Sequence, residues 1–406
     1  MNKNLLNFDD ALARLLDAAQ PVTETEATPL LEAEGRVLAA PLLSTLDVPP
    51  LDNSAMDGYA LRCADVLAAG TRLAVTQRIP AGSVGHHLAP GSAARIFTGA
   101  PLPKGADAVV MQERCERDGE AVIINHVPRD GENIRRRGED IRAGSEILAA
   151  GTRLTPQALG LAASIGVPLL PTFRRLRVAL FFTGDELSTP GEPLKPGGIY
   201  NSNRYLLRGL LDRLGCAVTD LGIVPDTLEA TRDALRRAAA LSDLIVTSGG
   251  VSVGEEDHVK PAVEAEGQLG LWKLAIKPGK PLAFGRIATG NNSNAADFIG
   301  LPGNPVASFV TFLILVRPFI LKRMGCSGWL PRRILLPAGF DWLRPDARRE
   351  FLRARIGADG RLELFPHQGS GVLTSTVWAG GLVDNPPGQA IRAGDIVQFI
   401  PYGDLL

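Results

Sequence analysis

Between Arg177 and Thr247 the sequence alternates between short apolar runs and longer segments with the spacing of amphipathic helices. The apolar runs are Arg177–Phe182, Ala217–Val224 and Leu244–Thr247, and the helical segments are Asn203–Gly215 and Thr227–Ala240. Such alternation is typical of a parallel α/β sheet, because parallel strands need a crossover connection that is usually a helix. Ligands of these sheets bind outside the carboxyl ends of the strands. We therefore expect a central parallel α/β domain over residues 174–328, with its functional loops at the strand ends.

The rest of the chain predicts three further units, so the expected fold class is a multidomain α/β protein. Residues 49–140 contain short apolar runs separated by Gly, Pro and Asp, which indicates an inserted β module. Residues 1–48 and 141–173 flank this module and predict a helical, elongated linking domain. Its expected helices are Phe8–Leu16, a second one within Pro21–Val37 that ends near Gly35, and Thr155–Ile165. Residues 329–406 return to short strands with glycine turns and predict a small C-terminal β-barrel.

Bulk composition limits the partners and the compartment. The 43 basic and 44 acidic side chains give a formal net charge of −1, so no global field attracts nucleic acid or an anionic membrane. The four cysteines form no C-x-x-C pair, which favours reduced, buried thiols. The apolar run Val306–Val316 stops at Arg317 and is shorter than a membrane span, and Met1–Asp10 lacks the apolar core of a secretory signal. We expect a cytoplasmic protein with no nucleic-acid and no membrane partner.

The most suggestive strand end is the glycine-rich segment Thr247–Asp257. Its glycines let backbone N–H groups approach a phosphate closely, and a helix that starts after the segment would add its positive dipole. The candidate binding residues here are Ser248, Gly249, Gly250, Ser252 and Gly254. A tight strand-to-helix turn without a ligand has the same pattern, so both interpretations stay open at this point.

Carboxylates at successive strand ends suggest a metal site. Glu186 follows the first predicted strand, Asp226 the second and Asp257 the third. The carboxyl ends of parallel strands meet at one edge of the sheet, and carboxylate oxygens suit magnesium. Acids beside a phosphate cradle can hold a divalent metal that bridges the phosphate. Each acid alone fits a surface cap equally well, and it is the convergence of the three that favours a metal pocket.

Two further segments offer basic and rigid elements. Three lysines around a Pro-Gly turn suit a tetrahedral oxyanion, although a solvated basic edge strand has the same composition. These lysines are Lys273, Lys277 and Lys280. The loop Gly300–Val306 precedes the apolar run, and its candidate residues are Pro302, Asn304 and Pro305. The two prolines make this loop rigid, and Asn304 either presents its amide to a ligand or caps the helix.

Loops of the predicted β module add further candidates. Asp57 and Asp140 lie in glycine-bounded loops, where a polar side chain is either functional or turn-forming. The run Arg135–Arg137 fits either a solvated face or a phosphate-facing cluster. A third polar segment, Arg95–Pro101, lies between these loops.

Together these stretches closely resemble the molybdopterin molybdenumtransferase family, which includes the bacterial MoeA proteins and the E domain of gephyrin. The matching segments run from Asp47-Val48-Pro49 through Arg135–Asp140 and on through the segments around Gly249, Trp272 and Pro302. The resemblance spans nearly the whole chain. It implies a homodimer of elongated four-domain subunits, in which each active site lies between the β module of one subunit and the α/β and terminal domains of the other.

The resemblance also implies a reaction. The family inserts molybdate into adenylated molybdopterin and releases AMP in a magnesium-dependent step. The soft dithiolene ligands of molybdenum belong to the substrate, which agrees with the absence of clustered cysteines in this sequence. Molybdopterin adenylyltransferase and later proteins of molybdenum-cofactor biosynthesis are the implied partners.

The resemblance assigns roles to individual residues by motif. The catalytic set is Asp57, Thr98, Asp140, Glu186, Asp226, Asp257, Lys273 and Lys277. Magnesium is assigned to Asp226 and Asp257, with Glu186 as the third acid of the pocket. Arg353 and Ser370 match terminal-domain residues that the family associates with molybdate.

Two alternatives belong to other classes of function. The glycine-rich turn is similar in style to that of the related adenylyltransferases, so adenylation of the pterin is one alternative, and consumption of ATP would reveal it. The other is a non-enzymatic scaffold of the gephyrin type, which tight binding of a partner peptide without molybdate-dependent turnover would favour.

Overall fold

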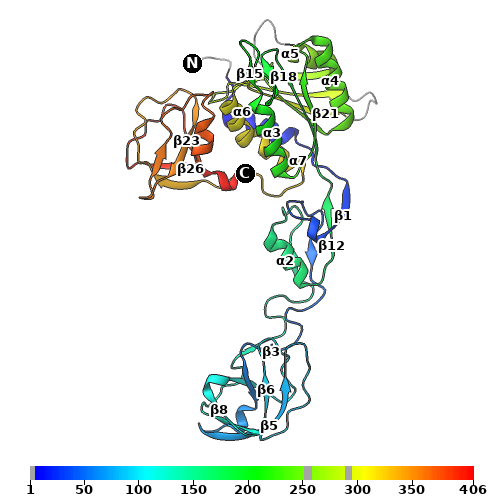
Figure 1. The fold of residues 1–406 in the computed structure, drawn as a ribbon, viewed down its shortest axis with the longest axis vertical. Coiled ribbons are helices and arrows are strands. Elements are labelled where there is room, and N and C mark those ends of the chain that lie inside the picture. Colours follow the sequence, from blue (N-terminus) through cyan, green and yellow to red (C-terminus); the bar gives the residue numbers. More distant parts are fainter. Residues whose placement is uncertain (1–4, 251–257, 289–294) are drawn as a thin grey trace.

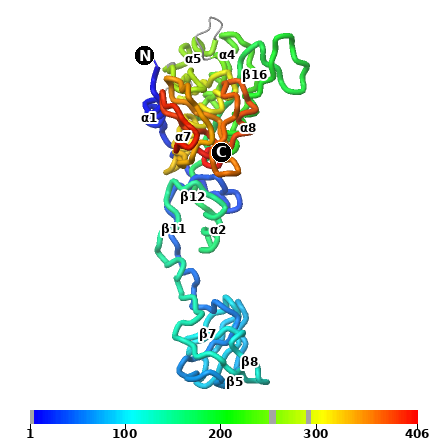
Figure 2. Tube along the Cα trace, turned by 90° about the vertical axis from the view of Figure 1, so that its left-hand side faces the viewer, coloured from blue at the N-terminus to red at the C-terminus, as the bar shows by residue number. Residues whose placement is uncertain are grey.

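The computed structural model describes residues 5–250, 258–288 and 295–406. The molecule is elongated, with an α/β domain and a C-terminal domain side by side at one end and a β module at the other (Figure 1). A thin linking segment joins the two ends (Figure 2). The expected order of units along the chain therefore corresponds to an extended arrangement in space.

The α/β domain is built on a six-stranded sheet with the order β16-β13-β17-β21-β20-β18. Its strands are β13 (Arg177–Thr183), β16 (Ala217–Val224), β17 (Leu244–Ser248), β18 (Gly267–Lys273), β20 (Pro281–Ala288) and β21 (Ala295–Leu301). The first four strands in this order pair in parallel, as expected, whereas β20 and β18 are antiparallel. The three predicted strands pair in parallel, and the sheet also has an antiparallel edge, because β18, β20 and β21 follow one another through short connections and pair as neighbouring antiparallel strands.

Helices cover both faces of this sheet (Figure 1). On one face α4 (Leu228–Leu241) and α5 (Val259–Glu266) pack in a cluster that includes Phe181 and Phe298. On the other face lie α1 (Phe8–Ala18), α3 (Ser202–Leu214) and the apolar helix that follows β21. The N-terminal helix thus packs on the α/β core, with Phe8 and Leu15 buried there, and not within the linking segment where residues 1–48 were expected.

The apolar helix runs without a break from Pro305 to Arg323, as α6 (Pro305–Thr311), a π-turn over Phe312–Val316 and α7 (Arg317–Arg323). The helix continues past Arg317, where the apolar run ends, because its guanidinium finds acceptors at the carbonyls of Trp329 and Asp404. By length and composition alone, this is one helix that could span a membrane. However, 83% of its apolar window is buried inside the protein, as in the core helix of a soluble domain.

The linking segment consists of short antiparallel ladders and one helix. Its elements are β1 (Thr25–Pro29), β2 (Leu42–Leu43), β11 (Glu146–Leu148), α2 (Pro156–Ser164) and β12 (Leu169–Phe173). The helix α2 was predicted correctly, and Thr155 caps it. The helix expected within Pro21–Val37 was wrong, because β1 pairs with β12 and only Leu30–Glu32 forms a 3-10 turn. Pairing with a segment more than 100 residues away outweighed the local helical spacing.

The β module holds a six-stranded sheet with the order β7-β4-β6-β5-β9-β8 and a two-stranded ladder of β3 and β10. Its strands are β3 (Asn53–Ser54), β4 (Gly58–Leu61), β5 (Thr71–Ile79), β6 (Ser92–Ile96), β7 (Ala108–Met111), β8 (Cys115–Asp118), β9 (Ala121–Ile124) and β10 (Ile134–Arg135). Two separate apolar clusters, one around Leu61 and one around Ile96, lie on opposite faces of the sheet. The module therefore has its own core.

The C-terminal domain is a curved sheet with the order β19-β23-β25-β26-β22, with β24 paired to β23. Its elements are β19 (Ile276–Lys277), β22 (Ile334–Pro337), β23 (Arg349–Ile356), β24 (Leu362–Leu364), α8 (Thr374–Trp378), β25 (Gly381–Asn385) and β26 (Ile396–Pro401). A bridge between Ala338 and Leu362 links the ends of this arrangement. Phe351, Leu382 and Tyr402 join the core cluster of the α/β domain, so the two domains share apolar packing.

Candidate functional site

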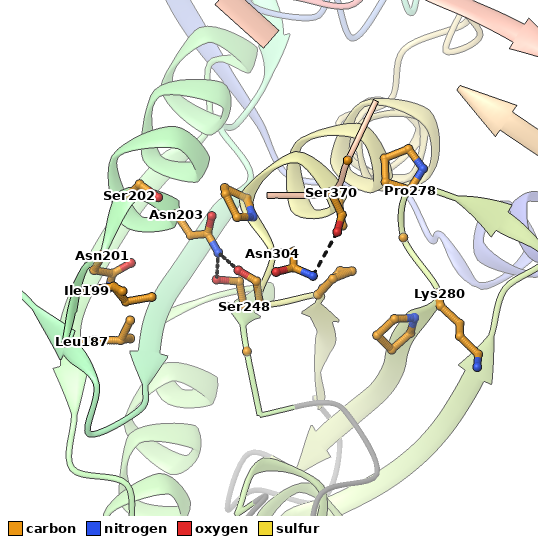
Figure 3. A pocket seen from close by; sticks show the side chains of 18 of the residues that line it. Leu187, Ile199, Asn201, Ser202, Asn203, Ser248, Pro278, Lys280, Asn304 and Ser370 are labelled. Carbon is orange, nitrogen blue, oxygen red and sulfur yellow. Dashed lines mark hydrogen bonds between the residues drawn. The ribbon is translucent and has the colours of Figure 1, made fainter. Parts of the chain in front are cut away.

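A cavity of about 820 Å³ opens at the carboxyl ends of β13, β17 and β21, where the α/β domain meets the C-terminal domain. Its lining comes from these strand ends, from the start of α3, from the turn after β19 and from a loop of the C-terminal domain (Figure 3). Of the predicted site residues, those in the lining are Glu186, Ser248, Gly249, Lys277, Lys280, Pro302, Asn304, Pro305 and Ser370. A pocket of this size accommodates a substrate as large as a nucleotide.

At the end of β17, glycines place backbone without side chains at the cavity. Gly249 and Gly250 have φ values of 89° and 63°, a left-handed conformation that glycine adopts without strain. The Gly249 N–H donates to the carbonyl of Leu301, and a Cβ placed on Gly303 would lie 3.6 Å from Cα of Gly249. These glycines allow the loops after β17 and β21 to pack closely at the cavity. Ser252, Gly254 and Asp257 of the same segment lie outside the described residues.

Asn203 holds three segments of the cavity wall together. Its Nδ2 donates to Oγ of Ser248 at 3.0 Å and to the carbonyl of Gly303 at 2.8 Å (Figure 3). Asn201, two residues earlier, caps α3 by accepting from the N–H of Arg204. Within the described parts of the chain, Nδ2 of Asn201 and Oδ1 of Asn203 are buried without a hydrogen-bond partner. Buried polar atoms are normally paired, so these two are exceptions, and both asparagines line the cavity.

Sequence reasoning missed both asparagines. The polar run Asn201-Ser202-Asn203 follows a short strand, β15 (Ile199–Tyr200), and precedes an amphipathic helix, which is the signal of an N-cap. That signal identified the start of a helix, but the contact between Asn203 and Ser248 depends on tertiary packing.

The basic side chains at the cavity are held by two acids of the C-terminal domain. Lys277 Nζ lies 3.5 Å from Oδ2 of Asp346 and 3.3 Å from Oε1 of the fully buried Glu350. Arg348, which sequence reasoning also missed, donates from Nε and Nη2 to the two carboxylate oxygens of Asp346, each at 2.9 Å. These Arg348 hydrogen bonds, with a smaller effect of the Lys277 charge, hold the pKa of Asp346 well below its usual range. Lys277 and Arg348 are thus fixed cations at the cavity wall, whereas Lys280 is exposed.

The loop before the apolar helix is tied to the C-terminal domain. Asn304 Nδ2 donates to Oγ of Ser370 at 3.2 Å, and the carbonyl of Ser370 accepts from the N–H of Val306 at 3.0 Å (Figure 3). Asn304 stands at the N-cap position, but its side chain makes no capping hydrogen bond. The helix-capping interpretation of its side chain was therefore wrong. Asn304 instead joins the α/β domain to Ser370 at the cavity.

Arg353 lies behind the cavity wall and does not line it. It is fully buried, and it donates to Oγ of Ser375 and to the carbonyls of Phe351 and Gly369, at 3.2 to 3.3 Å. Burial lowers the pKa of the Arg353 guanidinium to about 10. Gly369 belongs to the loop that carries Ser370 into the cavity, so Arg353 acts on the site by supporting this loop.

The described residues include only part of the predicted acidic pocket. Glu186 lines the cavity, whereas Asp226 does not, and Asp226 Oδ1 accepts from Oγ1 of Thr183 at the end of β13. The described residues contain no group of three His, Cys, Asp or Glu side chains that could hold a metal. With Asp257 outside the described ranges, the magnesium assignment stays a prediction.

Four other predicted catalytic residues lie outside the cavity lining. Asp57 and Thr98 are in the β module, at the other end of the molecule (Figure 1), where Oδ1 of Asp57 accepts from both N and Oγ1 of Thr98. These two hydrogen bonds lower the pKa of Asp57. Asp140 is exposed where the β module meets the linking segment, and Lys273 is exposed at the end of the edge strand β18. One copy of the chain therefore does not bring the predicted catalytic set together.

Comparison with known proteins covers the whole architecture. Residues 6–166 match the MoeA N-terminal region (domain I and II), residues 179–322 match the probable molybdopterin binding domain, and residues 336–402 match the MoeA C-terminal region (domain IV). The molybdopterin molybdenumtransferase of Haemophilus influenzae is 39% identical over 411 residues, covering 99% of this chain and all of the relative. The chain belongs to the MoeA family of molybdopterin molybdenumtransferases.

Other members of the MoeA family support the same assignment. The molybdopterin molybdenumtransferase of a Nostoc species is 41% identical, over 82% of this chain and 77% of the relative. The crystal structure of the molybdopterin biosynthesis MoeA protein from Pyrococcus horikoshii OT3 has a TM-score of 0.85 at 29% identity, and it covers 98% of this chain and all of the other. The resemblance read from the sequence motifs is thus confirmed.

Proposed function

We propose that this chain inserts molybdate into adenylated molybdopterin and releases AMP, as a transferase of molybdenum-cofactor biosynthesis. The observation that carries the proposal is the match over 99% of the chain to a relative named for the molybdenumtransferase activity. The cavity supports it independently, because its size suits a pterin nucleotide and its wall combines exposed backbone with fixed cations.

The residues of this chain divide the work at the cavity. Lys277, Arg348 and Lys280 offset the negative charge of the substrate phosphates. The backbone at Gly249 admits a phosphate closely, and Asn201 and Asn203, which line the cavity, orient the pterin. Ser370, held by Asn304, adds a hydroxyl where we propose that molybdate binds.

Two acids among the described residues support the magnesium proposal. Glu186 and Asp226 provide hard carboxylate oxygens near the ends of the paired strands β13 and β16, and Thr183 orients Asp226. Together with Asp257 they would hold the ion. When bound, magnesium supplies positive charge that neutralises the pyrophosphate.

We also propose that the enzyme is a cytoplasmic homodimer with shared active sites. Asp57 and Thr98 match catalytic positions of the family, yet one subunit holds them at the end of the molecule away from the cavity (Figure 1). A second copy that places its β module against the cavity would complete the set. Such a two-fold arrangement gives two identical sites for each dimer.

The decisive experiment incubates the purified chain with adenylated molybdopterin, magnesium and molybdate, and follows AMP release and molybdenum uptake. Molybdate-dependent release of AMP supports the proposal. Consumption of ATP with unadenylated molybdopterin, and no molybdate-dependent AMP release, would assign the chain to adenylation. Absence of any turnover, together with tight binding of a partner peptide, would favour a scaffold.

Sharing of the site is tested by mixing two inactive variants. Asp57→Ala removes the β-module contribution, and Lys277→Gln removes the cavity contribution. If sites are shared, random reassembly of the two variants restores one intact site in each mixed dimer, or about a quarter of wild-type activity. Each variant incubated alone is the control. A mixture as inactive as its parents would reject the shared site.

A further inference from the structure

The β module contains a second cavity, of about 470 Å³, that is separate from the candidate site. Its lining comes from β4, β5 and β6 and from the turn between β8 and β9. Three arginines line it, namely Arg78 on β5, Arg95 on β6 and Arg117 on β8. None of them has a role in the proposed transfer reaction.

A bulge in β5 brings two of these arginines side by side. The register of β5 against β6 shifts between Val75 and Gln77, and after the shift Arg78 stands directly opposite Arg95. Like charges directly opposite on neighbouring strands repel each other. Both guanidinium groups lie over the ring of Phe97, each 4.6 Å from its centroid, and this contact holds them in place.

Within the described residues, none of the three arginines forms an ion pair with a carboxylate. Arg95 donates to the carbonyl of Gly58 at 2.9 Å and to Oε1 of Gln112 at 2.6 Å, which are both neutral acceptors. Among the described residues, the Arg117 side chain makes one hydrogen bond, from Nε to the carbonyl of Gly119 at 3.4 Å. Glu120 also lines the cavity, but no described carboxylate lies within ion-pair distance of the three guanidinium groups.

Arg72, on the same strand as Arg78, forms an ion pair. Its Nε lies 2.6 Å from Oδ2 of Asp118, so its charge is paired on the protein surface. Arg78 is exposed at the cavity and has no such partner among the described residues, so its charge is available to a ligand.

We propose that Arg78, Arg95 and Arg117 bind the phosphate group of a small molecule in this cavity. Guanidinium groups match phosphate oxygens in charge and in the geometry of their paired donors. A cavity of about 470 Å³ exceeds what a single oxyanion fills and lies in the range of small-molecule sites. The ligand class is therefore a phosphomonoester, with its uncharged part over Tyr59 and Val75.

The position of this site links it to the predicted catalytic pair of the module. Arg95 bonds to Gly58 and stacks on Phe97, and these two residues are the chain neighbours of Asp57 and Thr98. A bound phosphate that fixes Arg95 would also fix the strands that carry this pair. The site can thus influence the Asp57 and Thr98 geometry without contacting either residue.

The test measures binding of adenosine 5′-monophosphate and, separately, inorganic phosphate to the full-length protein by calorimetry. The Lys277→Gln background is expected to weaken phosphate binding at the candidate site, so that failure of this proposal is distinguishable from failure of the proposed function. In that background Arg78→Gln and Arg117→Gln should each weaken the monophosphate by about tenfold or more. Arg72→Gln is the matched control, because it removes the same charge from the same strand, and it should change the affinity less than about twofold.

Hydrogen exchange locates the bound monophosphate. We expect slower exchange in β5 and in the β8–β9 turn on binding. Unchanged affinity in both arginine variants, or protection confined to the loops around Gly249, would overturn the proposal. So would binding of inorganic phosphate without the monophosphate, which would indicate a free oxyanion site. Dissociation of a dimer by Arg78→Gln, with binding unchanged, would assign the arginines to a protein interface instead.

Discussion

The two ends of this molecule are built differently. At one end the α/β domain and the C-terminal domain share one apolar cluster, and the candidate cavity lies where they meet. At the other end the β module has two small cores of its own, which contain no residue of the first end. Between them the linking segment offers only two-stranded ladders and one short helix, with a separate small core.

This contrast separates the residues that packing fixes at the cavity from those of the β module. Shared packing at the first end fixes Lys277, Asn304 and Ser370 relative to one another, so the cavity is formed within one chain. No shared apolar cluster of the described residues fixes Asp57 relative to the cavity in this way. This separation agrees with our proposal that the β module acts on a second copy, and the stability of the module should be separable from that of the cavity.

The largest effect should come from a cavity made in the core of the β module. Leu61 is fully buried there, so Leu61→Ala should cost about 3 kcal/mol of the free energy of unfolding. Hydrogen exchange should show lost protection in β4 and β9, with β13 and β17 unchanged. Leu67→Ala removes an exposed leucine of the same module and should have almost no effect. Equal loss of protection at both ends would break the distinction between them.

A substitution at the cavity should reduce the activity more than it reduces the stability of the fold. Lys277→Gln removes a fixed cation from the wall, and we expect kcat/KM for molybdate insertion to fall about 100-fold. Lys260→Gln serves as the control, because Lys260 lies on α5 in an exposed pair with Glu264. Steady-state AMP release measures both variants. Activity of Lys277→Gln within twofold of the wild type would remove Lys277 from the site.

The junction between the linking segment and the α/β domain should respond to pH. Burial raises the pKa of Asp243, but hydrogen bonds from Arg177 and Arg174 lower it more, so the folded-state pKa lies well below the usual range. The stability from this network is therefore present above the unfolded pKa of about 3.9 and is lost as the pH falls below it. Asp243→Asn should cost about 2 kcal/mol near neutral pH and much less near pH 3.

Chemical denaturation at several pH values measures the Asp243 effect. Asp212→Asn is the control, because Asp212 forms an exposed pair with Arg208 one helical turn away, and it should cost less than about 0.5 kcal/mol. The same loss for Asp243→Asn at both pH values would show that the charge network does not stabilise the junction.

The smallest effect should come from one hydrogen bond inside the linking segment. The hydroxyls of Thr28 and Thr172 lie 2.7 Å apart and are buried between β1 and β12. Thr172→Val should cost about 1 kcal/mol, because it leaves the hydroxyl of Thr28 without this partner. The double variant Thr28→Val with Thr172→Val should recover part of the loss. A cost of the double variant equal to the sum of the two single costs would show that the pair is not coupled.

Local pattern was sufficient for several elements of the fold. The strands β13, β16 and β17 and the helices α3 and α4 were predicted within one or two residues, because apolar periodicity and capping residues act locally. It failed for β1, whose partner β12 lies far along the chain, and for the antiparallel edge formed by β18 and β20. Pairing of this kind depends on which other segments of the chain are available as partner strands.

The same division holds for the candidate site. Gly249, Lys277 and Asn304 were recognisable as residue types that bind phosphates or stiffen loops, whereas Arg348 and Asn203 became site residues only through contacts with Asp346 and Ser248. The opposite case is Arg353, which was expected at the substrate but is buried behind Gly369.

By itself, the sequence determined the family of this protein, the order of its units and the chemical character of its strand ends. These properties follow from motifs and periodicities that adjacent residues carry. Only the tertiary structure decided which of the predicted residues meet in one cavity, and it left Asp57 and Thr98 at the far end of the molecule. The physical reason is that side chains distant in the chain are brought together by packing between domains, and no local pattern encodes that packing.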